Sequence, residues 1–376
     1  MGSSNSGHQG TRIVNSRWAV VAPLPPDEII SSWLVRTALL QGCDPMTLTL
    51  AVWPKWRIWT QDADRFLNED RLDQICDLSG IEKNALQAAS LYPIAIQVYG
   101  EKPPAKAAWA WFVAPGARNT KRHSGIKYCS TCLKNDVKPY FRIQWRFAWH
   151  TGCKAHGHAL LDRCHACNAP VEYHRLQAED KLITVCATCK VDLRAANVRS
   201  CLPDALKLQQ VADDVLVNGI RTFQGSAMSV TSWFELANYF VSLMRVAQRG
   251  GNEPLSKFLR LIGIQLPVGI PILPGNQLEI LQTHDRERLL AALFPMMSAN
   301  KIQFDVALQK SAITRQGFSG HGLVLPTWIR TTAASLPSAL REKSTRSTSR
   351  LDGPRSRYQV KRMMARLQRK LDMAKR

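Results

Sequence analysis

The stretch IKYCSTCLKNDVKPYFRIQWRFAWHTGCKAHGHALLDRCHACNAPV, residues 126–171, decides how this chain folds. It contains two C-x-x-C pairs and one C-x-x-H pair, and a further pair, CATC, follows at residues 186–189. Seven of the ten cysteines fall between Cys129 and Cys189. In a chain that shows no secretory signal, cysteine pairs at such spacing favour metal binding over a disulfide framework.

The spacing predicts two closed zinc sites with four ligands each. A C-x-x-C turn presents two thiolates to one tetrahedral ion, and a second pair brought back by a loop of ~20 residues completes the site. The first set has the pattern C-x2-C-x20-C-x2-H and the second C-x2-C-x18-C-x2-C. Such sites are structural, because they leave no coordination position open for water. The predicted ligands of the two Zn²⁺ ions are Cys129, Cys132, Cys153 and His156 in the first set, and Cys164, Cys167, Cys186 and Cys189 in the second.

His156 is the one predicted ligand for which nearby histidines are alternatives. His150 and His158 stand near enough in the chain to replace it, and the sequence leaves that choice open. His165 lies inside the CHAC turn, where we expect it to face solvent. A thioredoxin-like redox site would need one C-x-x-C motif at the start of a helix in a βαβ unit, which tandem pairs do not resemble. Cys201, beyond the second set, is expected to be a buried core thiol.

Helical patterns precede the metal-binding stretch. Pro26, followed by two acidic residues, predicts a helix start, and apolar residues at i, i+3 and i+4 spacing continue the helix to Gly42. Further helices are expected at residues 62–78 and 82–89. The apolar spacing of these two suits either a DNA-reading helix-turn-helix or a plain helical hairpin, and both interpretations stay open.

Other segments carry weaker signals. Residues 100–125 are rich in Pro, Ala and Gly and predict a linker or long loop. The aromatic and basic segment PYFRIQWRFAWH, residues 139–150, is typical of a short β-hairpin within a zinc ribbon. After Pro203 the chain returns to helical patterns, which are clearest at 211–223, 232–247 and 279–294.

Together these patterns predict a mainly α-helical protein with small β zinc ribbons. An N-terminal helical module that resembles a helix-turn-helix would precede a tandem zinc-binding module and a C-terminal helical module. The expected division is a flexible tail (1–22), an N-terminal helical domain with its linker (23–125), a tandem zinc-finger module (126–202), a C-terminal helical domain (203–337), and a basic tail with an amphipathic helix (338–376).

Positive charge is concentrated at the C-terminal end. The 376 residues include 50 Lys and Arg against 29 Asp and Glu, a net charge of +21. The segment Ser338–Arg376 has 13 Lys and Arg against three acidic residues, which is +10, and leaves +11 for the rest. A basic amphipathic helix of this kind can bind nucleic-acid phosphates, dock on a protein, or pack on its own body. The candidate nucleic-acid-binding residues are Arg362, Arg366, Arg369 and Lys370.

The motifs of several enzyme classes are absent from the sequence. It has no G-x-x-x-x-G-K-[ST], no H-E-x-x-H, no G-x-S-x-G, and neither half of the zinc-deaminase signature. It also has no membrane-spanning run of ~18 apolar residues, and the start MGSSNSGHQG lacks the apolar segment of a secretory signal. We therefore expect a cytoplasmic protein with an anionic partner and no membrane association.

These residues resemble the TniQ/TnsD family of transposition target-selection proteins. The segment PLPPDEIISSWLVRTALLQG, residues 23–42, is similar to the family's opening E-x-x-x-S-W-x-x-R motif. Residues 126–171 follow the family's order of CxxCL, a tryptophan-rich segment, CxxHGxxL and CxxC. The resemblance covers about residues 20–200, and the basic C-terminal helix has no counterpart in it.

The resemblance implies a non-catalytic adaptor in the bacterial cytoplasm. A homodimer of the chain agrees with this role. Such proteins read a target either by binding attachment-site DNA or by docking on an RNA-guided CRISPR effector and its guide RNA. They then recruit an AAA+ ATPase regulator, which brings in the transposase. Two alternatives remain from the residues alone, namely a stand-alone zinc-containing, sequence-specific DNA-binding regulator and a nuclease with an unrecognised site.

Overall fold

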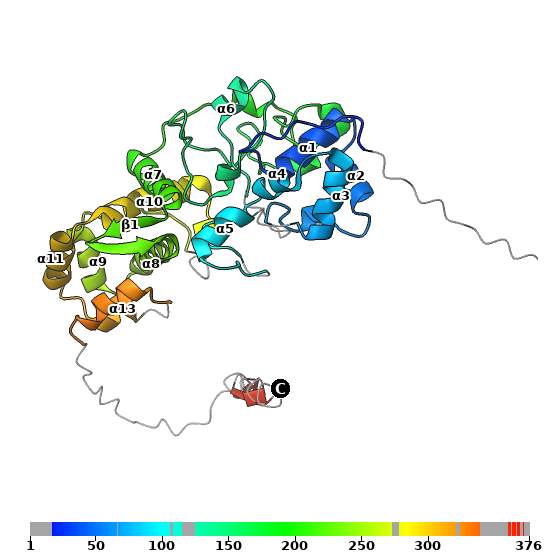
Figure 1. The fold of residues 1–376 in the computed structure, drawn as a ribbon. Helices are drawn as coiled ribbons and strands as arrows, with labels where there is room; N and C mark the ends of the chain where they lie inside the picture. Colours follow the sequence, from blue (N-terminus) through cyan, green and yellow to red (C-terminus); the bar gives the residue numbers. More distant parts are fainter. Residues whose placement is uncertain are drawn as a thin grey trace, which may run out of the picture. The chain divides into compact units, whose positions relative to one another are not determined.

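The computed structural model describes residues 17–65, 67–105, 108–114, 125–272, 278–320 and 324–338, and parts of 360–371. Contacts divide the chain into two compact units, Met1–Pro337 and Ser338–Arg376. The described residues are mainly helical, and they contain one two-stranded sheet (Figure 1). None of the helices in these ranges combines the length and the apolar character needed to cross a bilayer.

The N-terminal helices form their own buried cluster, which includes Trp33, Leu34, Ile75 and Leu86. A short 3-10 turn, Ile58–Thr60, lies between the second and third helices. The helices of this region are α1 (Ile30–Leu40), α2 (Pro45–Val52), α3 (Glu69–Ser79), α4 (Lys83–Ala88) and α5 (Tyr92–Tyr99).

The helix expected from Pro26 begins four residues later, at Ile30. The preceding backbone pairs instead with a distant segment of the metal-binding stretch. The Ile29 N–H donates to the Phe141 carbonyl at 3.0 Å, and the Ile143 N–H donates to the Asp27 carbonyl at 2.8 Å. These bonds satisfy backbone groups that a helix would otherwise use, so the helix starts after them.

The helices α3 and α4 follow each other across a short turn at Gly80 and pack together. The helix predicted over 62–78 begins only at Glu69, because the Asn68 side chain accepts the Arg71 N–H and caps α3 there. Gly80 ends α3 with φ +71°, a left-handed conformation that glycine adopts without strain. Leu72 packs with the buried residues of this hairpin.

The metal-binding stretch contains one short helix, α6 (Ser130–Asn135), and the 3-10 turns Ile143–Arg146, Tyr173–Arg175, Ala178–Asp180 and Leu193–Ala195. The β-hairpin expected at 139–150 is wrong. Ile143–Arg146 forms a 3-10 turn in place of a strand, and the side chains of Phe141, Trp145, Arg146 and Trp149 are all buried. The segment pairs instead through isolated bridges of Arg142 with Glu28 and of Phe147 with Phe112.

The expected linker at 100–125 is also partly a core segment. Within its described part, Trp109, Trp111 and Val113 are buried. The Trp111 N–H donates to the Glu279 carboxylate at 2.6 Å, and the Trp111 indole donates to the Phe234 carbonyl at 3.1 Å. Its run of aromatic and apolar side chains is therefore buried against the C-terminal half.

The C-terminal half is helical around a small hairpin. The helix expected at 211–223 ends at Asn218, because Gly219 takes a left-handed conformation (φ +73°), and the following residues form a strand. Around this hairpin lie α8, α9, α11 and α13 (Figure 1). The elements are α7 (Pro203–Asn218), β1 (Ile220–Phe223), β2 (Ser226–Ser229), α8 (Val230–Gln248), α9 (Glu253–Leu261), a 3-10 turn (Leu278–Ile280), α10 (Thr283–Ser298), α11 (Lys301–Ser311), α12 (Arg315–Ser319) and α13 (Thr327–Ala334). One continuous buried cluster extends from α1 through the metal-binding stretch to α13.

Candidate metal centres

The structure brings the four residues of the first predicted set together, with their ligand atoms all within 4.8 Å of one another. Cys129 immediately precedes α6 and Cys132 lies in its first turn. The Cys132 and Cys153 sulfur atoms are 3.5 Å apart. The His156 Nδ1 atom is 3.7, 3.3 and 3.4 Å from the Cys129, Cys132 and Cys153 sulfur atoms, respectively.

The second set converges in the same way, again within 4.8 Å. Its sulfur atoms approach in two pairs, Cys164 with Cys189 at 3.6 Å and Cys167 with Cys186 at 3.7 Å. Each pair joins one buried thiol to one exposed thiol, since Cys164 and Cys186 are buried and the other two lie at the surface.

Three of the four half-sites share one backbone turn. The N–H of the first cysteine bonds the carbonyl five residues later, at 2.7 Å for Cys153 and 2.8 Å for Cys164 and Cys186. The residue four positions after that cysteine is left-handed in each case, with φ of +66°, +56° and +63°. Sequence reasoning did not identify these three turn residues, Gly157, Asn168 and Lys190. Gly and Asn are the residue types that favour this conformation, so two of the three carried a readable signal.

The competing histidines bond elsewhere. The His150 Nε2 atom is 2.8 Å from the Asp213 carboxylate, and burial lowers the pKa of this imidazole. The His158 Nδ1 atom is 3.1 Å from the Thr131 hydroxyl. The His156 ring turns Nδ1 toward the three sulfur atoms, and its Nε2 atom is 3.5 Å from the Asn135 side-chain amide. The geometry therefore favours His156 over both competitors, and His165 is exposed as expected.

Both sets fit a small tetrahedral metal ion. Metal–sulfur bonds of ~2.3 Å in a tetrahedron place two sulfur atoms about 3.8 Å apart, close to the observed separations. Backbone N–H groups and neighbouring thiols already favour one thiolate in each set. Hydrogen bonds from the Cys129 and Cys132 thiols lower the pKa of Cys153 to about 3, and the Val191 N–H lowers the pKa of Cys189 to about 7. Burial raises the pKa of Cys164 to about 12, so a cation is needed for all four thiols of its set to ionise together.

The helix α1 is joined to the first set through the E-x-x-x-S-W-x-x-R motif. The Glu28 carboxylate is fully buried, accepts a hydrogen bond from the Ser32 hydroxyl at 2.6 Å and forms an ion pair with Arg36. The Ser32 hydroxyl in turn accepts the Phe141 N–H at 2.9 Å. The Trp33 indole donates to the Ala22 carbonyl at 2.8 Å. Each polar residue of the motif therefore bonds a group that packing removes from water.

The TniQ family model matches residues 19–160. The chain therefore carries a TniQ domain over these residues. No curated protein matches the chain. A TniQ domain fits a role in selecting the target of transposition, and the Cys and His clusters are compatible with metal binding.

The TniQ domain includes the whole first ligand set, because His156 precedes its end at residue 160. The second set and residues 161–200, which we expected to resemble the family as well, lie beyond the match. Cys201 is buried, as expected, and burial raises its pKa to about 12. Four predicted nucleic-acid-binding residues lie outside the described residues, namely Arg362, Arg366, Arg369 and Lys370.

A buried ionic network crosses the TniQ domain at Arg146. Its guanidinium pairs with the Asp62 carboxylate at 2.7 Å and with the Asp64 carboxylate. Asp64 also accepts the Ser31 N–H and hydroxyl, both at 2.9 Å, and the Ser31 hydroxyl lies 2.6 Å from the Tyr173 hydroxyl. Arg146 therefore joins α1, the segment before α3 and the loop of the second set. Burial raises the pKa of Asp64 to about 6 against the opposing effect of Arg146.

Replacing Arg146 with glutamine is expected to lower the free energy of unfolding by about 3–5 kcal/mol, because two buried carboxylates lose their cation. The folded state holds Asp64 at a raised pKa, so it binds a proton at pH values where the unfolded chain does not. The contribution of Asp64 to stability therefore rises as the pH falls through about 6. Because Arg146 lowers the pKa of Asp64, the variant R146Q raises that pKa further, and a protonated Asp64 needs no cation. The loss of stability in R146Q should therefore be smaller at about pH 6 than at about pH 8.

Denaturant unfolding of R146Q at both pH values, beside R57Q, measures this. Arg57 is exposed, so its replacement should change stability little. The difference between the two variants cancels effects of pH that they share. A loss in R146Q below ~1 kcal/mol would contradict the buried network.

Proposed function

We propose that this protein is a non-catalytic target-selection adaptor of a transposon. It links a target to an AAA+ ATPase regulator and, through that regulator, to the transposase. The observation that carries the proposal is the TniQ match over residues 19–160, which contains a complete four-ligand metal cluster. The sequence has no G-x-x-x-x-G-K-[ST], H-E-x-x-H or G-x-S-x-G motif, which agrees with an adaptor.

The proposal assigns one structural Zn²⁺ to each ligand set. Sulfur and imidazole donors with four ligands and no vacant position are typical of structural zinc. The separations of 3.3–3.7 Å between donor atoms support this assignment in both sets. In the first set the ion would join α6 to the turn at Cys153. In the second it would close the loop that bonds α1 through Tyr173.

The target is DNA, read directly or presented by an RNA-guided CRISPR effector. The net charge of +21 supports contact with nucleic acid on either route. The proposed division of labour follows the expected boundaries, with the helical module of 23–125 and the zinc module of 126–202 facing the target or the regulator. The basic tail of 338–376, with Arg362, Arg366, Arg369 and Lys370, would supply phosphate contacts.

The purified zinc-loaded protein is expected to co-purify with its AAA+ regulator on duplex DNA when ATP is present. It should neither hydrolyse ATP nor cut DNA with added Mg²⁺. Affinity capture of the tagged chain, with and without ATP and duplex, measures the association. Absence of the regulator under all these conditions would contradict the adaptor. Tight binding to one duplex sequence with no effect of the regulator would instead identify a stand-alone DNA-binding regulator.

A further inference from the structure

Four large apolar residues are exposed around the corner where α1 leads into α2. Between 46% and 53% of the surface of each is open to solvent, and they are Val20, Leu40, Met46 and Leu50. We call these four residues the corner patch. Within the described part of residues 17–99, the other exposed large apolar residue is Ile96. Single exposed apolar residues are ordinary on a protein surface, whereas a group of them marks an interaction site.

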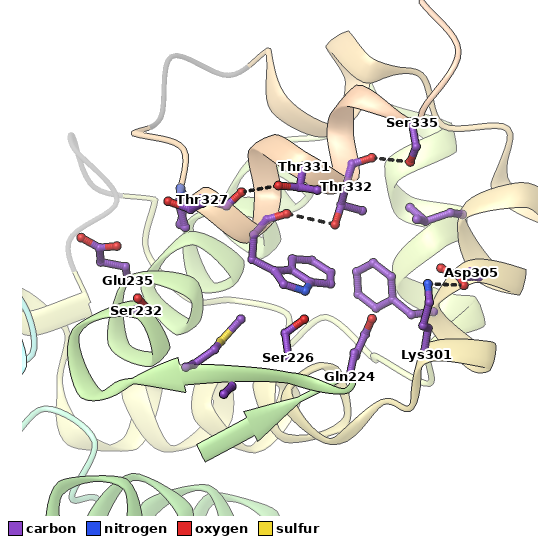
Figure 2. A pocket seen from close by; sticks show the side chains of 16 residues that line it. Gln224, Ser226, Ser232, Glu235, Lys301, Asp305, Thr327, Thr331, Thr332 and Ser335 are labelled. Atoms are coloured by element: carbon purple, nitrogen blue, oxygen red, sulfur yellow. Dashed lines mark hydrogen bonds and ion pairs between the residues drawn. The ribbon is translucent and has the colours of Figure 1, made fainter. Parts of the chain in front are cut away.

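A pocket of about 550 Å³ among the C-terminal helices differs from the corner patch, because its polar side chains bond within the protein (Figure 2). The Thr331 and Thr332 hydroxyls donate to carbonyls one turn earlier in α13, at 3.2 and 3.0 Å. Lys301 pairs with Asp305 at 2.9 Å. These groups already have partners, whereas about half of each residue in the corner patch remains in contact with water.

Hydrogen bonds hold Val20 beside the end of α1. The Gln41 side-chain amide donates to the Val20 carbonyl at 3.0 Å. Leu40, the neighbour of Gln41, is the last residue of α1. The Trp33 indole donates to the Ala22 carbonyl, so the segment before α1 runs back along this helix. Val20 and Leu40 therefore lie close together on the surface.

The helix α2 supplies the other half of the corner patch. The Gly42 N–H bonds the Leu39 carbonyl at 3.1 Å, so the chain turns at once from α1 towards α2. Met46 and Leu50 are four residues apart on α2 and share its exposed face. The helix has no charged residue. A helix that is apolar all round is normally buried, so the exposed face of α2 is one that a partner would cover.

The exposed charges beside the corner patch are positive. Among residues 17–57 the exposed charged residues are Arg17, Lys55 and Arg57. The last two directly follow α2. The Trp59 indole donates to the Thr49 hydroxyl at 2.9 Å, so the segment that contains Lys55 and Arg57 folds back along α2.

The three acids of residues 17–57 are engaged inside the protein. Glu28 is buried in its ion pair with Arg36. Asp27 accepts the Tyr140 hydroxyl at 2.7 Å, and Asp44 accepts the Ala178 N–H at 2.8 Å. An apolar surface with cations at its edge is complementary to apolar side chains flanked by carboxylates. A second copy of this chain fits less well, because a two-fold contact would bring the same cations together.

We propose that the corner patch binds an amphipathic helix of a partner protein whose leucine-like side chains are flanked by Asp or Glu. The apolar side chains of that helix cover the corner patch, and its carboxylates pair with Lys55 and Arg57. This surface goes beyond the proposed function and does not depend on it, since binding can be tested without DNA, regulator or transposase.

Binding is measured on the full chain with methyl-labelled methionine and NMR. Met46 belongs to the corner patch, and its signal is assigned with Met46→Leu. The probes are the capped peptide Glu-Glu-Leu-Leu-Glu-Ala-Leu-Leu-Glu-Glu, the same peptide with Lys in place of Glu, and the same peptide with Ser in place of Leu. The first peptide is expected to shift the Met46 signal at millimolar concentration, and the other two are not. No shift with the first peptide, or an equal shift with either of the others, would overturn the proposal.

Substitutions of exposed residues separate the two parts of the contact. Leu50→Ser should weaken binding of the first peptide by about five- to tenfold, because the leucine area that the peptide covers is lost. The matched control Ile96→Ser, on α5 outside the corner patch, should leave binding unchanged. Replacing Lys55 and Arg57 with glutamine should weaken binding by about two- to fivefold and remove most of its salt dependence. Unchanged affinity in Leu50→Ser, with its melting temperature kept, would refute the assigned role of the corner patch.

Two further measurements test other occupants of the corner patch. Analytical ultracentrifugation of the chain alone detects a second copy. Self-association that Leu50→Ser abolishes and Ile96→Ser keeps would replace the partner helix by a dimer contact. Flotation with phosphatidylglycerol vesicles detects a lipid surface, and vesicle binding that only Leu50→Ser abolishes would assign the corner patch to a membrane instead.

Discussion

Replacing Cys132 with serine is expected to leave one Zn²⁺ per chain instead of two and to unfold the TniQ domain. Cys132 is buried, and its sulfur atom lies 3.5 Å from that of Cys153 and 3.3 Å from His156 Nδ1. A structural zinc site contributes an apparent ~10–16 kcal/mol, strongly dependent on pH. That contribution equals or exceeds the net stability of a typical domain, about 5–15 kcal/mol. The loss of one ligand is therefore expected to unfold the domain around the site as well as release the ion.

The unfolding should spread because the residues between the two halves of the first set are core residues. Trp145 and Trp149 lie in this interval and are buried in the main cluster. The Arg142 and Phe141 backbone groups pair with the start of α1. Without the ion, nothing holds Cys153 to Cys132 at the end of this interval. The residues that precede α1 then lose their hydrogen bonds to the backbone of residues 141–143.

Elemental analysis and near-ultraviolet circular dichroism measure the two parts of this prediction. The matched control is Cys76→Ser, a half-buried cysteine on α3 that belongs to neither set, which should keep two Zn²⁺ and its tertiary signal. In the second set, Cys164→Ser should release the other ion. It should also loosen α1 and α2, because that loop bonds Ser31 through Tyr173 and Asp44 through the Ala178 N–H. Two Zn²⁺ per chain in C132S would contradict the assignment of the first set.

The ligand sets were predictable because their chemistry is local. A C-x-x-C or C-x-x-H turn needs only four consecutive residues, and the loop of ~20 residues between halves closes at little entropic cost. The structure brings together the same eight residues that spacing selects. It also separates His156 from its competitors, which spacing alone left open, since orientation depends on Asp213 and Thr131 in other segments.

The features that sequence reasoning missed depend on distant partners. Trp111 bonds Glu279, which lies 168 residues away in the sequence. The sequence around Trp111 alone therefore predicts a linker, because nothing near it indicates this partner. Residues 139–150 alternate as a strand would, but they form a 3-10 turn between isolated bridges, and within the described residues no second strand pairs along them. The late start of α1 has the same cause, since the backbone before Ile30 bonds residues more than a hundred positions later.

The network at Arg146 had no sequence signal at all. A basic residue in a basic aromatic segment predicts a solvated or nucleic-acid-facing side chain. In the structure it is buried, and its carboxylate partners precede it by 82 and 84 residues. The positive charge of the sequence therefore predicted an anionic partner for the whole chain. It could not show which basic residues form ion pairs inside the protein and which lie on a surface that binds that partner.

Deleting residues 338–376 is expected to weaken DNA binding by about a hundredfold or more at moderate salt and to flatten its salt dependence. The segment holds 13 Lys and Arg against three acidic residues. If it neutralises about five phosphates, the slope of log K against log[salt] should fall by about 4–5 on its removal. Both predicted ligand sets lie outside it, so zinc content should stay at two ions per chain.

Fluorescence anisotropy with one duplex across a salt series measures the slope, and deletion of residues 2–16 is the control. That segment contains one Lys or Arg, so its loss should move the slope by at most about one unit. A second variant replaces Arg362, Arg366, Arg369 and Lys370 with glutamine and keeps the apolar residues of the helix. If phosphate contact is the role of the tail, this variant should reproduce about four units of the lost slope. If it binds DNA as the intact chain does while the deletion loses only the regulator, the tail is a protein-docking helix, and the nucleic-acid assignment of these four residues is wrong.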